Sequence, residues 1–263
     1  MGTVAIVTGG SSGIGRETAR CLMEQGITVY EFSRRDTKAV GITHFSVDVT
    51  DEPSVQAAVQ AVFEQEKHID ILVNCAGFGI SGAVEFTELQ DAKRQLDVNF
   101  FGTVNCTKAV LPIMHRQRKG KIVCVSSVAG AIPIPFQTFY SVSKSAINAY
   151  ATALANEVRP YGIQVCAVQP GDIASGFTDA RAKSAAGDRE YGGRISRSVR
   201  VMEKDERSGM SPAQAGAYIA GLALKKNVKP LYAIGAVYKL FCVIMRLLPC
   251  RFSNWLLYMI YAK

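Results

Sequence analysis

Metal-ligating side chains are scarce in this sequence of 263 residues. It contains three histidines, which are far apart and have no cysteine or second histidine at ligand spacing beside them: His44, His68 and His115. Zinc sites in proteins use three or four such ligands, usually at short spacings. We therefore expect no metal site.

Paired cysteines are also missing. The seven cysteines are an odd number and are spread through apolar stretches without a paired spacing, at Cys21, Cys75, Cys106, Cys124, Cys166, Cys242 and Cys250. Small secreted domains held by disulfides show even numbers at regular spacings. The pattern predicts buried free thiols in a reducing compartment.

We also expect neither a leader peptide nor a membrane-spanning helix. A glycine-rich motif begins within the first ten residues, which leaves no room for a charged and apolar leader. The longest uncharged run, Ile122 to Ser143, has 22 residues but contains Gly130, Pro133 and Pro135. It is predicted to be a strand followed by a loop. We expect a cytoplasmic protein.

Acidic residues are fewer than basic ones: 30 Lys and Arg against 22 Asp and Glu give a net charge of +8. A basic surface attracts nucleic acid, anionic lipid and phosphorylated ligands alike. The basic clusters are short and scattered rather than arranged as a stripe, at Arg34-Arg35, Arg116 to Lys119 and Lys225-Lys226. We expect no nucleic-acid partner.

Short apolar runs alternate with longer helical patterns, which is typical of βαβ units around a parallel sheet. Strands are predicted at Val4–Thr8, Thr28–Ser33, Thr43–Val47, Ile69–Asn74, Lys121–Ser126, Gln164–Gln169 and Leu231–Ile234. Helices are predicted at Gly13–Gln25, Pro53–Glu66, Leu89–Arg116, Phe139–Arg159 and Pro212–Lys225. The length and average composition favour a single doubly wound α/β domain covering the whole chain.

The glycine motif from Thr8 to Gly15 follows the first predicted strand and opens the first predicted helix. Glycines in such a turn let the backbone approach a pyrophosphate at the helix N-terminus, where free N–H groups and the helix dipole favour negative charge. The strand, turn and helix context predicts a dinucleotide site.

Tyr140 and Lys144 are four residues apart, so a helix would place both side chains on one face. An ammonium beside a phenol stabilises the phenolate and lowers the pKa of the tyrosine toward a range useful for proton transfer. Lys144 is also the first charge after the uncharged run, so its field is poorly screened. The pair is a candidate acid/base site.

Further polar motifs follow the other predicted strands or lie between them. They are Asp48-Val49-Thr50, Asn74-Cys75-Ala76-Gly77, Asn99, Ser126-Ser127 and Pro170-Gly171. In this order and spacing, together with the glycine motif and the Tyr140/Lys144 pair, they resemble the short-chain dehydrogenase/reductase family from Val4 to about Ser175. Two positions depart from the usual pattern of that family, Cys75 for asparagine and Ser175 for threonine.

The resemblance implies a parallel sheet in strand order 3-2-1-4-5-6-7 and hydride transfer between a nicotinamide and a carbonyl or alcohol carbon. It assigns Tyr140 as general acid/base, Lys144 as the group that lowers its pKa and binds the ribose, Ser127 as the residue that positions the substrate oxygen, and Asn99 as the holder of a relay water. It also implies a homodimer or homotetramer. The implied cofactor-binding residues are Gly9, Ser11, Ser12, Gly13, Ile14, Gly15, Ser33, Arg34, Arg35, Asp48, Val49, Asn74, Ala76, Gly77, Tyr140, Lys144, Pro170, Gly171, Ile173 and Ser175.

The end of the second predicted strand indicates which nicotinamide is used. Ser33 stands where members of the family that use NAD tend to carry aspartate, and Arg34 and Arg35 follow it. Guanidinium groups bind phosphate with paired hydrogen bonds, which favours NADP(H). Two observations favour NAD instead. Ser12 stands at a position where a basic residue is common in members that use NADP(H). Glu31 would be the ribose ligand if the strand ended earlier.

Two segments lie outside these motifs: a stretch rich in Ala, Gly, Ser and Arg from about residue 174 to 209, predicted to be a mobile lid, and an apolar extension from about 236 to 263. Apolar residues in the extension repeat at helical spacing on both sides of Pro249. It is expected to pack on the domain or on another subunit; a membrane-surface anchor or a lid over the substrate are the alternatives.

The substrate pocket should be built by these two segments. The extension and the region around Asn99 are most similar to hydroxysteroid, retinol and acyl-ketone reductases, so an apolar carbonyl substrate is expected. A 3-oxoacyl or small-ketone reductase is the alternative. A protein that binds nucleotide without catalysis is a remote one, because Asn99, Ser127, Tyr140 and Lys144 are all present.

Overall fold

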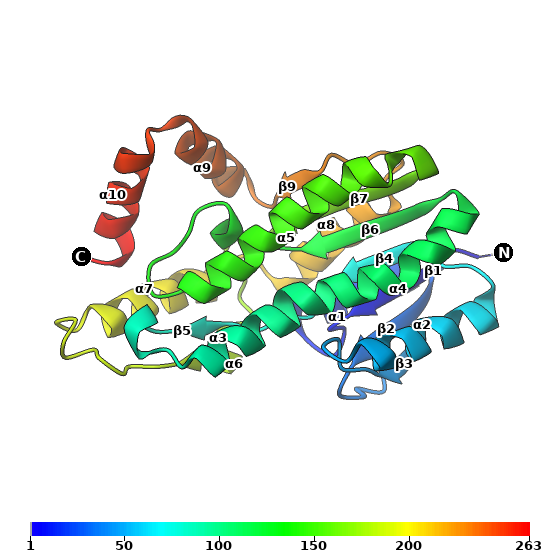
Figure 1. Cartoon of the computed structure of the whole chain (residues 1–263), viewed down its shortest axis with the longest axis horizontal. Coiled ribbons are helices and arrows are strands. Elements are labelled where there is room, and N and C mark those ends of the chain that lie inside the picture. The colour runs from blue at the N-terminus through cyan, green and yellow to red at the C-terminus, as the bar shows by residue number, and fades with distance from the viewer. Residues whose placement is uncertain (1) are drawn as a thin grey trace.

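A parallel sheet of seven strands forms the centre of the computed structural model, which describes residues 2–263 (Figure 1). The strand order is β3-β2-β1-β4-β6-β7-β9. This confirms the predicted sheet and its order. The strands are β1 (Val4–Thr8), β2 (Thr28–Ser33), β3 (Ile42–Ser46), β4 (Ile71–Asn74), β6 (Gly120–Val125), β7 (Ile163–Gln169) and β9 (Leu231–Ala233).

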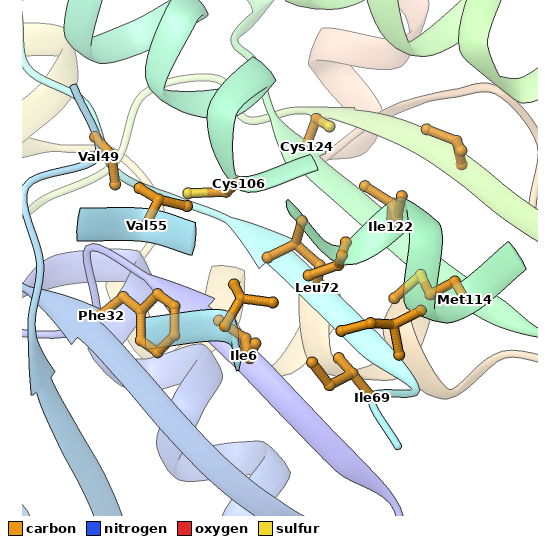
Figure 2. Packing of buried hydrophobic residues seen from close by; sticks show 14 of the residues in the cluster. Ile6, Phe32, Val49, Val55, Ile69, Leu72, Cys106, Met114, Ile122 and Cys124 are labelled. Atoms are coloured by element: carbon orange, nitrogen blue, oxygen red, sulfur yellow. The ribbon is translucent and has the colours of Figure 1, made fainter. Parts of the chain in front are cut away.

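Helices cover both faces of the sheet. Cores with residues from α2 (Glu52–Glu66), α4 (Gly102–Gln117) and α5 (Thr138–Glu157) lie on one face, and cores with residues from α1 (Gly13–Glu24) and α8 (Pro212–Leu224) on the other. Figure 2 shows the first core, where side chains such as Ile6, Leu72 and Ile122 from the sheet meet Cys106 and Met114 of α4. Both faces of the central strands are therefore buried, which explains why they read as continuous apolar runs.

Prolines mark the starts of two helices, as predicted. Pro212 follows Ser211, whose hydroxyl accepts a hydrogen bond from the backbone N–H of Gln214 at 3.2 Å, while the Gln214 side chain accepts one from the N–H of Ser211. This capping box fixes the N-terminus of α8. α8 packs closely on α1, and a side chain at Gly216 would collide with Glu17.

The predicted helix Leu89–Arg116 is interrupted. It consists of α3 (Leu89–Leu96), a π-helical turn at Asp97–Phe101, and α4. The turn carries Asn99 into the interior, where its amide donates to the carbonyl of Phe78 and to the Ser143 hydroxyl, both at 3.0 Å. These contacts stabilise a wider turn that the periodicity of the sequence does not reveal.

The segment 174–209 holds more regular structure than its composition suggests. It contains α6 (Phe177–Ala180), the short strand β8 (Ala182–Lys183) and α7 (Arg194–Arg207). β8 pairs with β5 (Ile80–Ser81) in a second, two-stranded sheet. The remaining short elements are 3-10 turns at Val84–Phe86, Val128–Gly130 and Arg159–Tyr161.

The C-terminal extension forms two helices, α9 (Ala236–Leu247) and α10 (Cys250–Tyr261), broken at Pro249 as predicted. Figure 1 shows them projecting from the body of the molecule, with the C-terminus near α7. Leu257 packs with Val128 and Ile132, so the extension does contact the domain. Within residues 2–263, no helix is long and apolar enough to cross a membrane.

Burial of the cysteines differs along the chain. Cys106, Cys124 and Cys166 are buried in the core, as predicted, and burial raises the pKa of each thiol to about 12. Cys250 is exposed at the start of α10, so the expectation of burial is wrong there.

Candidate active site

One cavity of about 740 Å³ lies across the carboxyl ends of the strands. Ligands of open parallel sheets bind at this edge. Twenty residues predicted from the sequence line it: Gly9, Ser11, Ser12, Gly13, Ile14, Gly15, Ser33, Arg34, Arg35, Asp48, Val49, Ala76, Gly77, Ser127, Tyr140, Lys144, Pro170, Gly171, Ile173 and Ser175. Residues from Gly9 to Ser175 in the sequence therefore meet in one site.

The glycine loop has the geometry of a phosphate cradle. Gly9 has a φ of 68°, and a Cβ there would lie 2.8 Å from the Cα of Ala76. A Cβ on Gly15 would lie 2.4 Å from the carbonyl oxygen of Gly9. The Ser12 side chain caps no N–H group of α1, so the first turn of that helix keeps free donors toward the cavity.

Arg34 and Arg35 are exposed at the end of β2 and line the cavity beside Ser33. Among residues 2–263 neither arginine forms a salt bridge. Hydrogen bonds from Thr50, together with the charges of Arg34 and Arg94, lower the pKa of Asp48 against the opposing effect of burial. This end of the cavity therefore presents guanidinium groups without fixed anionic partners.

Glu31, unlike Arg34 and Arg35, does not line this end of the cavity. The residue is 4% exposed, and its Oε2 is 2.6 Å from Nδ1 of His44 on β3. A Cβ on Gly10 would lie 2.3 Å from the Cγ of Glu31, so the carboxyl group is packed under the glycine loop. Glu31 is absent from the cavity lining, because β2 continues to Ser33. The strand boundary that would make Glu31 the ribose ligand is not the one observed.

Tyr140 and Lys144 lie one turn apart on α5, and both line the cavity. The Lys144 ammonium donates to the carbonyl of Val125 at 2.9 Å and is 5.7 Å from the centroid of the Tyr140 ring. Ser127 caps the 3-10 turn after β6, with its Oγ accepting from the N–H of Ala129 at 3.1 Å. Three of the four predicted catalytic side chains, Ser127, Tyr140 and Lys144, therefore line the same cavity.

The pKa of Tyr140 moves opposite to the prediction. Burial raises it to about 12, and a hydrogen bond with Ser127 offsets the rise only in part. Burial also lowers the pKa of Lys144 to about 8. Desolvation is therefore the largest influence on the pKa of Tyr140, and the phenol is protonated at neutral pH. A protonated phenol can donate to an oxygen that gains negative charge, as in carbonyl reduction.

Two predicted residues do not line the cavity. The Asn74 side chain is buried on the α4 side of β4, where its amide donates to Thr107 Oγ1 at 3.2 Å, and its predicted contact with a cofactor remains a prediction. Asn99 is fully buried, and its Oδ1 also accepts from the N–H of Phe78 at 2.9 Å. Its amide thus fixes the loop after β4 to α5, and its predicted role in a water relay remains a prediction.

The substrate end of the cavity is built largely by segments outside the motifs, as predicted. Phe177 and Met202 come from the segment 174–209, and Phe241 and Tyr261 from the C-terminal helices. The Phe177 ring lies 5.7 Å from that of Tyr140 between centroids. Sequence reasoning missed the loop after Ser127, which contributes Ile132, Ile134 and Gln137, because loops of this kind carry no periodic pattern.

Tyr238 of α9 ties the extension to the end of β7. Its hydroxyl donates to a carboxylate oxygen of Asp172, and a Cβ on Gly171 would lie 2.3 Å from its ring. Burial and the nearby carboxyl groups of Asp205 and Glu206 raise the pKa of Asp172. Arg181 is paired with Glu206, whereas Asp172 and Asp205 form no salt bridge within residues 2–263. All three carboxyl groups line the cavity.

A nicotinamide dinucleotide fits these features. The glycine loop would hold its pyrophosphate, the end of β2 its adenosine ribose, and Lys144 its nicotinamide ribose. When bound, the reduced cofactor supplies a hydride. The chain would supply a proton donor, Tyr140, and the hydroxyl of Ser127 that would hold the substrate oxygen beside it.

A doubly wound sheet with a glycine-loop cradle and a Tyr–Lys pair defines the class of nicotinamide-dependent oxidoreductases. The chain belongs to the short-chain dehydrogenase family, whose family model matches residues 3–186.

Among its relatives, a 3-ketodihydrosphingosine reductase of Bacteroides thetaiotaomicron is 40% identical over 98% of both chains. Dehydrogenase/reductase SDR family member 7B of Bos taurus is 33% identical over 85% of this chain and 71% of its own. A short-chain dehydrogenase structure from Streptomyces avermitilis superposes with a TM-score of 0.83 at 27% identity, covering 97% and 96% of the two chains.

Proposed function

We propose that this protein is an NADPH-dependent reductase of long-chain lipid ketones. The observation that carries the proposal is the set of apolar side chains in the cavity that holds Tyr140: Phe177, whose ring lies 5.7 Å from that of Tyr140, and Ile132, Phe241 and Tyr261. Apolar walls bind an alkyl chain by removing it from water. The relative that shares 40% of its residues along almost the whole chain is a reductase of 3-ketodihydrosphingosine, a lipid ketone.

The phenol of Tyr140 is the proton donor in the proposed reaction. The ketone oxygen would lie between Tyr140 and Ser127, where the phenol can donate to it and the Ser127 hydroxyl can hold it. As the carbon accepts a hydride, the oxygen gains charge and takes the phenolic proton. The raised pKa of Tyr140 keeps that proton in place at neutral pH, which suits the direction of reduction.

NADPH is the proposed electron donor because Arg34 and Arg35 could bind its 2′-phosphate and form no salt bridge within residues 2–263. Both guanidinium groups line the cavity, and the carboxyl group of Glu31, which would repel a 2′-phosphate, is packed away from it under Gly10. Paired hydrogen bonds from an arginine to a phosphate add geometric specificity to charge attraction.

The cofactor proposal is tested with Ser33→Asp combined with Arg34→Leu. The double variant should shift the ratio of kcat/KM from NADPH toward NADH by roughly two orders of magnitude, since one strong attraction is lost and a repulsive charge is gained. Arg118→Leu, a surface arginine away from the cavity, is the control. A wild-type enzyme that already prefers NADH would contradict the proposal.

Carboxyl groups in the cavity further support an amine-bearing lipid ketone. A 3-ketodihydrosphingosine is a sphingoid base, with an amine on the carbon next to the ketone. Asp172 and Asp205 line the cavity without a cationic partner, although the protein as a whole carries a net charge of +8. An ammonium group beside Asp172 would provide the missing counter-charge.

The substrate proposal is tested with matched ketones. We expect NADPH consumption with a long-chain 3-keto sphingoid base, and roughly tenfold lower kcat/KM with the same ketone lacking the amine, as expected for one charge-assisted contact. Asp172→Asn should reduce that preference while leaving the amine-free ketone unaffected. Equal rates with both ketones in the wild type would refute amine recognition, and turnover restricted to short polar ketones would refute the lipid proposal.

A further inference from the structure

The outward side of the C-terminal helices is apolar. Eighteen large hydrophobic side chains are exposed within residues 2–263, and ten of them lie on α9 and α10: Val237, Leu240, Val243, Ile244, Leu247, Phe252, Trp255, Tyr258, Met259 and Ile260. We call these ten residues the apolar tail face. Leu247 is 79% exposed and Trp255 52%. Exposed apolar patches of this kind mark interaction sites.

The opposite side of the same helices is apolar as well. Tyr238, Phe241 and Met245 of α9 and Leu257 and Tyr261 of α10 pack over Val128 and Ile132. Surface helices of soluble proteins normally turn a polar face outward, and a helix that is hydrophobic all round is covered on every side. The inward side is covered by the domain, whereas the apolar tail face is exposed and not covered by other residues of 2–263.

Charge identifies what covers this face. No acidic residue follows Glu206 in the sequence, and the only charged side chains of residues 236–263 are Lys239, Arg246, Arg251 and Lys263. All four are exposed. A second copy of the chain would bring the same positive charges against them, whereas an anionic lipid surface would attract them. Trp255 and Tyr258 are residues that prefer the boundary between lipid and water.

Helix length agrees with a position on the surface of a bilayer. α9 and α10 have 12 residues each, about 18 Å at 1.5 Å per residue, and Pro249 separates them. Spanning needs about 20 apolar residues, whereas interfacial helices lie along the membrane with one face among the acyl chains.

We propose that the apolar tail face docks this protein on an anionic lipid surface. α9 and α10 then lie between the bilayer and the cavity, since their inward side chains Phe241 and Tyr261 line that cavity. The route from the bilayer into the cavity rests on the proposed function, because it requires a lipid substrate. Docking itself does not depend on that function.

Vesicle sedimentation tests docking without any measurement of activity. The full-length protein is mixed with vesicles of phosphatidylcholine alone, or of phosphatidylcholine with phosphatidylglycerol, at low and high salt. We expect the protein to sediment with the anionic vesicles at low salt, and its apparent affinity to fall roughly tenfold or more at high salt or without the anionic lipid.

Paired variants identify the surface responsible. Leu247→Ser with Trp255→Ser removes two outward side chains that do not line the cavity, and should weaken sedimentation by roughly tenfold or more. Val84→Ser with Leu89→Ser removes two hydrophobic residues that are 52% and 65% exposed elsewhere, and should leave it unchanged. NADPH binding by both variants shows that the fold is intact.

Three outcomes would overturn the proposal: no sedimentation with anionic vesicles, sedimentation that the tail variant leaves unchanged, or a dimer in solution that Leu247→Ser with Trp255→Ser converts to a monomer while lipid binding is absent. The last result would assign the apolar tail face to a second copy of the chain.

Discussion

Lys144 shows how burial and charge compete at a single residue. Its ammonium donates to the carbonyl of Val125, and burial lowers its pKa from 10.5 to about 8. The same burial raises the pKa of the neighbouring Tyr140 phenol. In the protein without cofactor, each group is thus shifted toward its neutral form. A bound cofactor with negative phosphate groups would favour the charged lysine again.

This shift predicts a pH dependence of stability. Between pH 8 and 10.5 the folded protein releases the Lys144 proton while the unfolded chain retains it, so the contribution of Lys144 to the free energy of unfolding rises with pH in this window. Over the full shift the rise amounts to about 3 kcal/mol.

Urea unfolding of the wild type and of Lys144→Met, without cofactor, measures this contribution. Groups other than Lys144 cancel in the difference between the two proteins. The difference should move in favour of the wild type by about 3 kcal/mol from pH 7.5 to 10.5. A difference that stays constant with pH would show that Lys144 has an ordinary pKa.

At the scale of elements, the π-helical turn between α3 and α4 depends on one side chain. Asn99 makes hydrogen bonds to both the N–H and the carbonyl of Phe78 and to the Ser143 hydroxyl. Asn99→Ala would leave the N–H of Phe78 without its partner and would remove two further hydrogen bonds, at a cost of about 1–3 kcal/mol in the free energy of unfolding. The carbonyl of Phe78 still accepts from Gln95 at 3.1 Å, and the Ser143 hydroxyl still donates to the carbonyl of Tyr140 at 2.7 Å. Chemical unfolding should show this loss, and the exposed Asn156→Ala should not.

Activity provides a second measure of Asn99. Phe78 and Gly77 lie at the cavity, and the turn after β4 depends on the Asn99 amide. We therefore expect Asn99→Ala to lower kcat as well as stability. Full activity in a folded Asn99→Ala protein would show that the reaction does not depend on how Asn99 positions the turn after β4.

Regular elements were predictable from the sequence where the signal is local. The apolar runs of β1 and β7, the prolines at the starts of α2 and α8, and the break at Pro249 all predicted elements within a few residues. The π-helical turn was not predictable, because its cause is a contact between Asn99 and Phe78, which comes from another loop. The pairing of β5 with β8 joins two-residue strands about 100 residues apart, and so short a strand has no periodicity.

The candidate site divides in the same way. The positions of Gly9 and Tyr140 in the cavity could be predicted, because both belong to motifs whose spacing is set by the sheet. The orientation of Asn74 depends on which face of β4 it occupies, and a strand buried on both faces gives no pattern to decide that. The pKa of Tyr140 depends on burial, which the spacing of Tyr140 and Lys144 does not contain.

For the whole molecule, the extension is an addition to a complete core. The two large cores on the faces of the sheet contain no residue beyond Ile234. A chain ending at Gly235 should therefore fold and bind NADPH, and should lose the cavity wall made by Phe241 and Tyr261. We expect its KM for a lipid ketone to rise at least roughly tenfold, as expected for the loss of one or two apolar contacts.

Thermal unfolding and NADPH titration of the truncated chain check the first part of this prediction, and steady-state kinetics the second. Aggregation of the truncated chain would show that α9 and α10 belong to the core. An unchanged KM would show that they do not form the substrate site.

The most direct test of the proposed reduction traces the hydride with deuterium and removes the proposed proton donor by substitution. NADPH carrying deuterium at both C4 positions is incubated with a long-chain 3-keto sphingoid base, and the product is analysed by mass spectrometry. The wild type should place one deuterium on the former ketone carbon. Tyr140→Phe should slow product formation by at least about 100-fold while its affinity for NADPH stays within about twofold. Product without deuterium, or substantial turnover by Tyr140→Phe, would contradict the account.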